Sequence, residues 1–247
     1  MATPLQDKIA FINGGSRGIG AAIARRLAAD GASVALTYHG SAAAAEALAG
    51  EIEAAGGRAL ALRCDAADPA SLREAIDSVA SRLGRIDILV NNAGVFRAGA
   101  IDTATVEDFD YTVGINVRSV FAATQAALRH MPQGGRIVNI SSCNALRMPM
   151  PGAALYAMSK SALTGLVKGL AYDLAPRAIT INNVLPGPVD TDMNPEHTEF
   201  GQSLHRFMAL QRHGRPEEVA AMVAYLAGTE AGFVTGADLL IDGGFAA

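Results

Sequence analysis

The sequence predicts an α/β domain built on a doubly wound parallel sheet, and two observations lead to that fold class. The first is a rhythm, because short apolar runs alternate with longer segments of helical periodicity from one end of the chain to the other, as in repeated β-α-β units. The second is that most apolar runs are continuous rather than alternating, which is typical of parallel strands buried on both faces. We therefore expect one sheet with helices on both faces.

The expected strands are short runs rich in Ile, Val, Leu and Ala. In chain order they are 8–12 (KIAFI), 33–37 (SVALT), 58–63 (RALALR), 86–90 (IDILV), 136–140 (RIVNI), 179–184 (ITINNV) and 238–241 (DLLI). The segments between them have helical patterns, and the expected helices are 18–30, 41–55, 69–83, 105–130, 155–175 and 215–227. One long interruption of this order, 187–214, is rich in Pro, His, Met and Phe. A loop of that length is usually a functional lid or a disordered stretch, and we expect a lid over the substrate.

The composition excludes several classes of protein. The chain has 247 residues, half of them hydrophobic, and a net charge of −4, which argues against a general binder of nucleic acid or anionic membranes. No linker or repeat divides it, so we expect one domain over 1–247. The sequence contains no signal peptide and no apolar stretch that could span a membrane. Cys64 and Cys143 form no metal or disulfide spacing, so we expect reduced thiols and a cytoplasmic location.

A glycine-rich loop joins the first strand to the first helix. Gly14, Gly18 and Gly20 give the spacing G-x-x-x-G-x-G, with Ser16, Arg17 and Ile19 between them. Glycine permits a tight turn and close approach of the backbone to a pyrophosphate, and the helix N-terminus offers free N–H groups to the phosphates. The alternative is an ordinary turn, but its place at the start of a β-α-β unit favours a dinucleotide-binding loop.

The end of the second strand distinguishes between the two nicotinamide cofactors. An NAD-binding domain usually has a carboxylate there for the ribose 2′-hydroxyl, whereas this chain reads Thr37-Tyr38-His39-Gly40-Ser41. Arg17 can meet a 2′-phosphate through its guanidinium, and His39 and Ser41 could add donors. We therefore expect NADP(H) rather than NAD(H).

Tyr156 and Lys160 lie four residues apart in an expected helix, on one face and about one turn apart. The structural alternative is a half-buried Tyr with a Lys that reaches past it into solvent. The functional reading is a proton donor beside a cation, since an ammonium lowers the pKa of a neighbouring phenol.

Together these motifs resemble the short-chain dehydrogenase/reductase family, in its order and over nearly the whole chain. The matching residues are the loop 13–20, Asn91-Asn92-Ala93-Gly94, Asn116, Ser142, Tyr156-x-x-x-Lys160 and Pro186-Gly187. Within the family the chain is similar to the NADP-preferring, 3-oxoacyl-carrier-protein-reductase-like branch. Segments 147–163 and 186–192 also resemble a cyclic-di-GMP-binding mediator of biofilm dispersal.

The resemblance implies a Rossmann fold with strand order 3-2-1-4-5-6-7 and the site at the carboxyl ends of the strands. It implies a catalytic set in which Tyr156 is the proton donor, Lys160 also binds the nicotinamide ribose, Ser142 stabilises the substrate oxygen, and Asn116 holds a water that links Lys160 to solvent. Cofactor contacts are expected, besides those of the catalytic Tyr and Lys, from Gly14, Ser16, Arg17, Gly18, Ile19, Gly20, His39, Ser41, Asp65, Ala66, Asn91, Asn92, Ala93, Gly94, Pro186, Gly187, Val189 and Thr191.

Two positions depart from the family pattern. Asn13 stands where the family usually has Thr, and an amide can still cap the turn. The spacing from Ser142 to Tyr156 is 14, whereas the family's usual spacing of 13 would select Cys143. We choose Ser142, because it directly follows the strand end, and explain the difference by a one-residue insertion within 144–153.

The residues expected to contact substrate lie in 144–155 and in the lid. They are Ser142, Asn144, Met150, Met193 and Phe207, which favour a ketone or aldehyde with an apolar body. The histidines His197, His205 and His213 are scattered in the sequence, so no metal site is expected.

Self-association into a homotetramer or homodimer is expected. Helix 155–175 carries Leu163, Leu166, Val167, Leu170 and Leu174 on faces that cannot all meet the sheet, and the family pairs this helix and 105–130 across a two-fold axis.

Three functions remain open from the sequence. The leading one is NADPH-dependent reduction of a carbonyl substrate. The alternatives are a nucleotide-binding regulator of the cyclic-di-GMP kind and a 3-oxoacyl-carrier-protein reductase of fatty-acid synthesis. The complete catalytic set favours an enzyme, and the dispersed Arg25, Arg26, Arg129 and Lys168 show no basic patch for an acidic carrier protein.

Overall fold

The computed structural model describes residues 3–247, and seven strands of this range form one parallel sheet in the order β3-β2-β1-β4-β5-β6-β7. The predicted fold class and strand order are thereby confirmed. The strands are β1 (Ile9–Asn13), β2 (Ser33–Tyr38), β3 (Arg58–Arg63), β4 (Ile88–Asn91), β5 (Arg136–Ile140), β6 (Thr180–Pro186) and β7 (Asp238–Ile241). Each lies within two residues of its expected bounds.

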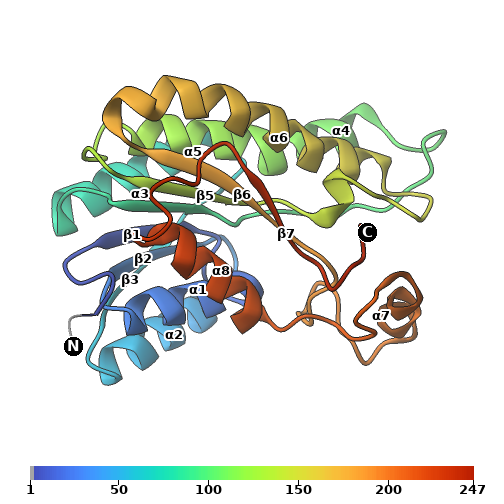
Figure 1. Cartoon of the computed structure of the whole chain (residues 1–247), viewed down its shortest axis with the longest axis horizontal. Helices are drawn as coiled ribbons and strands as arrows, with labels where there is room; N and C mark the ends of the chain where they lie inside the picture. The colour runs from blue at the N-terminus through green and yellow to red at the C-terminus, as the bar shows by residue number, and fades with distance from the viewer. Residues whose placement is uncertain (1–2) are drawn as a thin grey trace.

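Helices cover both faces of the sheet, as Figure 1 shows. One face carries α1 (Gly18–Ala29), α2 (Ala42–Ala54) and α8 (Pro216–Ala227). The other carries α3 (Pro69–Leu83), α4 (Val106–Val113), α5 (Ser119–Ala127) and α6 (Ala154–Leu174). Successive residues of β1 point to opposite faces of the sheet. Ala10 and Ile12 belong to the core beneath α1 and α8, whereas Phe11 belongs to the core beneath α3 and α5. A continuous apolar strand therefore contributes side chains to the cores on both faces of the sheet.

A row of amides crosses the middle of the sheet near the carboxyl ends of the strands. Asn91, Asn139 and Asn183 are paired in register on adjacent strands. Asn91 donates to Asn139 at 2.9 Å, Asn139 to Asn183 at 3.0 Å, and Asn183 to Asp238 at 2.7 Å. Because these side chains are almost fully buried, each must find its partner within the row.

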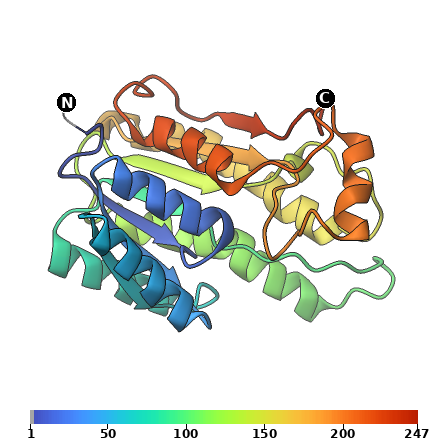
Figure 2. The same ribbon diagram turned by 90° about the horizontal axis from the view of Figure 1, so that it is seen from below.

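The expected lid contains more regular structure than a loop. Within 187–214 the chain forms the short helix α7 (Glu199–Leu204) and a 3-10 turn, His205–Phe207. Figures 1 and 2 both place α7 beyond the end of the sheet toward which the strands point. The expected helix 105–130 is also divided, because a π-helical segment, Gly114–Arg118, separates α4 from α5.

Part of the expectation for helix 155–175 was wrong. Leu163, Val167 and Leu174 are buried, so three of the five apolar residues meet the core rather than solvent. The exposed side of α6 instead carries Met158 and Tyr172 among small residues. No helix among residues 3–247 is long and apolar enough to cross a membrane.

Candidate active site

The glycine loop follows β1 and is shaped by close backbone approaches. Gly14 and Gly18 have positive φ angles, which glycine adopts without strain. A Cβ at Gly20 would lie 2.3 Å from the carbonyl oxygen of Gly14, and a Cβ at Gly14 would lie 2.8 Å from the backbone of Ala93. No larger residue fits either place, so the loop lies tightly against both α1 and the segment after β4.

The N-terminus of α1 is open to an anion. Arg17 at the N-cap makes no side-chain cap, and the first turn of the helix has no acidic residue. Free N–H groups and the positive end of the helix dipole therefore face the glycine loop without a competing carboxylate. The backbone here fits a bound phosphate.

Asn13 is held by a partner that the sequence did not indicate. Its Oδ1 accepts a hydrogen bond from the Thr37 hydroxyl at 3.0 Å, and the Gly14 N–H donates to the same hydroxyl at 2.9 Å. The Asn13 amide therefore does not cap the turn directly, because the Thr37 hydroxyl accepts the Gly14 N–H in its place. Thr37 therefore fixes the start of the glycine loop from β2.

The segment after β4 joins the glycine loop to the catalytic residues. Asn92 donates from its amide to the Gly14 carbonyl at 2.6 Å. A Cβ at Gly94 would lie 3.4 Å from Lys160 Nζ and 3.5 Å from Asn116 Oδ1, so the segment after β4 lies against both of these groups.

Asn116 lies in the π-helical segment, almost fully buried. Its Oδ1 accepts from the Val95 N–H at 2.8 Å, and its Nδ2 donates to the Val95 carbonyl at 3.0 Å and to Ser159 Oγ at 2.9 Å. Its side chain thus pins the segment after β4 to α6. π-Helical turns inside α-helices are common at functional sites.

Ser142 and Cys143 follow β5 and have different surroundings. Ser142 Oγ accepts from the Asn144 N–H at 3.1 Å, and its hydroxyl favours the phenolate form of Tyr156. The Cys143 side chain packs with Met208 and Phe245, and burial raises the pKa of this thiol to about 12. The hydroxyl next to the Tyr is therefore that of Ser142, as the position after the strand end indicated.

Tyr156 and Lys160 face each other from the first two turns of α6. Lys160 Nζ lies 5.8 Å from the centre of the Tyr156 ring and donates to the Ile140 carbonyl at 2.9 Å. Phe96 packs edge to face against the same ring, with centroids 5.1 Å apart. Lys160 is almost fully buried, so the reading in which it reaches into solvent is wrong.

Burial displaces the pKa of both groups toward their neutral forms. It raises the pKa of Tyr156 to about 12, although the Ser142 hydroxyl acts in the opposite direction and favours the phenolate. It lowers the pKa of Lys160 to about 8. Lys160 therefore does not lower the Tyr156 pKa in the chain by itself, because loss of hydration outweighs an ammonium that is held at the Ile140 carbonyl.

The segment after β6 closes over the glycine loop. The Gly187 N–H donates to the Ile241 carbonyl at 3.0 Å, and a Cβ at Gly187 would lie 2.7 Å from the Asp242 backbone. A Cβ at Gly18 would lie 3.3 Å from Thr191. Thr191 is thus brought to the glycine loop, and the expected cofactor contacts of Val189 and Thr191 stay a prediction.

The residues expected near a 2′-phosphate lie at the exposed rim. Arg17 and His39 are about two-thirds exposed. Arg17 lies 3.9 Å from Asp192, and His39 lies 3.8 Å from Asp65. Exposed pairs at such distances hold their side chains weakly, so the Arg17 guanidinium is free to turn toward a ligand.

The expected substrate residues are brought together only in part. Asn144 adjoins Ser142, and Phe207 packs on Phe245 beside Cys143. Met193 is mostly exposed. Among residues 3–247, neither Met193 nor Met150 belongs to the apolar cluster next to Cys143.

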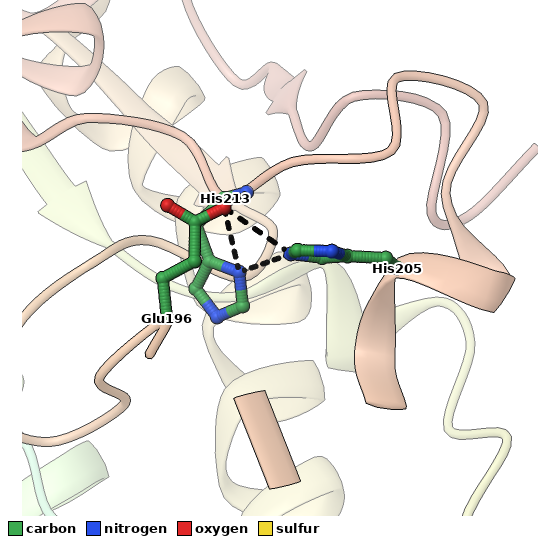
Figure 3. Close-up of side chains that lie close together, drawn as sticks. All are labelled: Glu196, His205 and His213. Atoms are coloured by element: carbon green, nitrogen blue, oxygen red, sulfur yellow. Dashed lines mark hydrogen bonds and ion pairs between the residues drawn. The ribbon is translucent and has the colours of Figure 1, made fainter. Parts of the chain in front are cut away.

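Two of the histidines described as scattered meet in the folded chain. Figure 3 shows His205 and His213 turned toward each other and toward Glu196. His205 Nε2 lies 2.9 Å from His213 Nδ1 and 3.3 Å from Glu196 Oε1. His197 is exposed and lies apart from this cluster. Nothing in the sequence spacing indicated the cluster, because the three residues come from separate turns of the lid.

The comparisons with known proteins agree with this geometry. The family profile described as "Enoyl-(Acyl carrier protein) reductase" matches residues 14–246. The chain is similar to the "Cyclic-di-GMP-binding biofilm dispersal mediator protein" of Escherichia coli, with 51% identity over 97% of this chain and 98% of that protein.

Two solved structures are similar over almost their whole length. One is a short-chain dehydrogenase/reductase from Serratia marcescens, with 58% identity, a TM-score of 0.98, and coverage of 99% of this chain and 100% of that one. The other is a short chain dehydrogenase from Burkholderia cenocepacia in complex with NADP, with 53% identity, a TM-score of 0.97, and the same coverage.

Proposed function

Because the chain belongs to the short-chain dehydrogenase/reductase family of oxidoreductases, we propose that it reduces a ketone or aldehyde to an alcohol with NADPH. The observation that carries this proposal is the convergence of Ser142, Tyr156 and Lys160 at the carboxyl ends of β5 and β4. Two hydroxyls and an ammonium meet there beside the glycine loop. A carbonyl oxygen needs such donors when it gains charge.

Tyr156 acts as the proton donor. Its pKa of about 12 keeps the phenol protonated throughout the neutral range, so the acid form is present when the substrate arrives. Ser142 donates to the substrate oxygen and stabilises its developing negative charge. Because Ser142 is close enough to influence the pKa of Tyr156, we expect one substrate oxygen to receive both hydroxyls.

Lys160 and Asn116 support that proton donor. Lys160 holds its ammonium beneath Gly94 and beside the Tyr156 ring, where it can bind ribose hydroxyls and attract a forming phenolate. Asn116 fixes the turn after β4 through its hydrogen bonds to the Val95 backbone, and the turn holds Gly94 next to Lys160. In the family an Asn at this position holds a water for the proton relay, and we assign that role here.

The chain's own residues fit NADP(H). The uncapped N-terminus of α1 and the glycine loop receive the pyrophosphate. Arg17, and from the end of β2 His39 and Ser41, take the 2′-phosphate, and no carboxylate follows β2 to repel it. The cofactor supplies a hydride when it is bound. The NADP complex of the similar Burkholderia protein supports this choice.

The substrate body lies between the loop after β5 and the lid. Asn144 offers a polar contact next to Ser142, and Phe207 offers an aromatic face. Met150 and Met193 could adapt their unbranched side chains to apolar substrates of different shapes. An aldehyde or ketone with an apolar body suits these groups.

The test is consumption of NADPH with a panel of aldehydes, ketones, quinones and acyl thioesters. We expect turnover with at least one carbonyl class and much slower turnover with NADH. Failure of every carbonyl compound with both cofactors would contradict the proposal.

A second candidate is a nucleotide-binding regulator, and the observation that favours it is the similarity to the cyclic-di-GMP-binding protein of Escherichia coli. Titration calorimetry with cyclic di-GMP, in the presence and absence of NADPH, separates the two functions. Binding of cyclic di-GMP without carbonyl turnover would favour the regulator.

A further inference from the structure

The lid contains a cluster of side chains that the proposed reaction does not use. Its members are Glu196, His205 and His213, and their Oε1, Nε2 and Nδ1 atoms all lie within 4.8 Å of one another. His213 is fully buried in its side chain, whereas His205 and Glu196 are partly exposed. We propose that these three residues bind a divalent transition-metal ion of the zinc class.

The distances between the three atoms fit one ion. They are 2.9 Å between the two imidazole nitrogens, and 3.3 Å and 3.9 Å from the carboxylate oxygen to His205 and His213. A point equidistant from the three atoms in their plane lies about 2.0 Å from each, and zinc is bound at about 2.0–2.2 Å by imidazole nitrogen and carboxylate oxygen. Figure 3 shows the three atoms at the corners of one small triangle.

The ligand types select the class of metal. Two imidazoles and one carboxylate suit zinc and its neighbours in the first transition row rather than calcium or magnesium, which prefer oxygen. A single proton can be shared between the two imidazole nitrogens, but the same proton cannot also form a good hydrogen bond to the Glu196 carboxylate. A divalent cation satisfies all three lone pairs at once.

The surroundings of the cluster resemble the outer shell of a metal site. The amide nitrogen of Asn194 lies 3.1 Å from His213 Nε2. A half-turn of this amide places its oxygen there instead, where it accepts the proton that a metal-bound imidazole keeps on its other nitrogen. The Glu196 carboxylate is oriented by the His213 N–H at 3.0 Å. The neighbouring guanidinium of Arg212 makes its side-chain hydrogen bonds to Glu218, at 2.7 Å and 2.9 Å, rather than to Glu196.

The site connects the lid to the segment after β6. Gly214, next to His213, donates to the Pro188 carbonyl at 2.9 Å and accepts from the Asp190 N–H at 2.9 Å. Asp190 in turn accepts from the Glu196 N–H at 2.9 Å. A bound ion therefore connects the lid to the segment after β6, whose residues are expected to contact the cofactor. That consequence rests on the proposed function, whereas the metal site does not.

The experiment is a titration of tag-free, chelator-treated protein with Co²⁺, followed by visible absorption and by competition with Zn²⁺. We expect absorption bands that saturate at one Co²⁺ per chain and disappear when Zn²⁺ displaces it. This readout involves neither NADPH nor a carbonyl substrate, so its failure is separate from failure of the proposed reaction.

Variants assign the binding to the cluster. We expect Glu196→Gln, which keeps the shape of the side chain, and His205→Ala to lose the saturable bands. Asn194→Ala should weaken affinity about 10-fold or more, since it removes only the outer partner. His197→Ala is the matched control, because it removes an exposed histidine of the same lid and should leave the titration unchanged.

Three results would overturn the proposal. They are the absence of saturable binding in the unmodified protein, equal affinity in His205→Ala or Glu196→Gln, and an equal loss in His197→Ala. In the first case the cluster is a hydrogen-bonded brace of the lid. In the other two the ion binds elsewhere on the surface.

Discussion

At the scale of single residues, the site depends on two ionisable groups whose environment favours their neutral forms. Tyr156 is surrounded by Phe96 and Ser142, and Lys160 has its ammonium on the Ile140 carbonyl. Burial raises the pKa of one and lowers the pKa of the other. Two consequences can be measured.

Tyr156→Phe removes one hydroxyl and leaves the ring against Phe96. If Tyr156 gives the proton, carbonyl reduction should slow by about 10²–10⁴-fold, with folding and NADPH affinity nearly unchanged. Steady-state kinetics and fluorescence titration measure both. Cys143→Ala is the control for the choice of Ser142, which lies 14 residues before Tyr156, over Cys143, and this variant should remain active. Normal turnover in Tyr156→Phe would contradict proton transfer from Tyr156 and would favour the alternative function as a nucleotide-binding regulator.

Lys160 should make stability depend on pH in the alkaline range. Its pKa falls from 10.5 to about 8 on folding, so the unfolded chain binds more protons between these values, and this group's contribution to stability rises as pH increases through that window. Urea unfolding of the protein and of Lys160→Met at pH 7.5, 8.5 and 9.5 isolates the effect. We expect the unfolding free energy of the unchanged protein to rise relative to that of Lys160→Met as the pH increases. A difference that stays constant across the three pH values would contradict the burial argument.

At the scale of elements, the sheet positions the site through its strand ends. Asn13, Asn91, Asn139 and Asn183 lie at one level on four adjacent strands, so the glycine loop and the loop after β5 start from the same edge. The amide row and the open N-terminus of α1 therefore each have a testable role.

Asn139→Ala should destabilise the fold without touching the catalytic groups. The change leaves the Asn183 oxygen without its partner and leaves the Asn91 amide only its longer bond to Thr124 at 3.4 Å. An unsatisfied buried group costs about 1–3 kcal/mol. We expect a lower midpoint of urea unfolding with an unchanged slope. A midpoint equal to that of the unchanged protein would mean that water replaces the lost amide.

Arg17→Ala should change cofactor selectivity more than activity with NADH. A charge-assisted contact to the 2′-phosphate is worth about 1.5–3 kcal/mol, so the preference for NADPH should fall by about 10- to 100-fold. The ratio of kcat/KM for NADPH to that for NADH measures it. An unchanged ratio would show that another group, such as His39, reads the 2′ position.

At the scale of the whole molecule, the adjacent helices α4, α5 and α6 each carry large apolar side chains that are exposed. Phe109 and Tyr111 of α4, Phe121 of α5, and Met158 and Tyr172 of α6 are all exposed to at least 40%. Large exposed apolar groups on adjacent helices mark a surface for association.

We expect this surface to pair two copies of the chain and a second contact to give a closed tetramer. Light scattering at micromolar concentration should give about four times the mass of the 25.4 kDa chain. Phe121→Asp should lower that mass while leaving the fold intact, because the side chain is half exposed. A mass equal to one chain in the unchanged protein would contradict self-association.

The sequence by itself determined what depends on local pattern. The order of strands and helices, the glycine loop and the spacing of Tyr156 and Lys160 all follow from residues close together in the chain, because apolar periodicity, glycine and helical spacing act locally. Ser142 was chosen over Cys143 by the same reasoning, from the end of its strand.

Only the tertiary structure decided the contacts between distant segments. It joined Asn13 to Thr37 and Asn116 to Ser159, turned Leu163, Val167 and Leu174 toward the sheet, and brought Glu196, His205 and His213 together. It also raised the Tyr156 pKa where an isolated Lys neighbour predicted a fall. The physical reason is that burial and side-chain partnership depend on which surfaces the whole fold packs against each other, and no spacing along the chain records them.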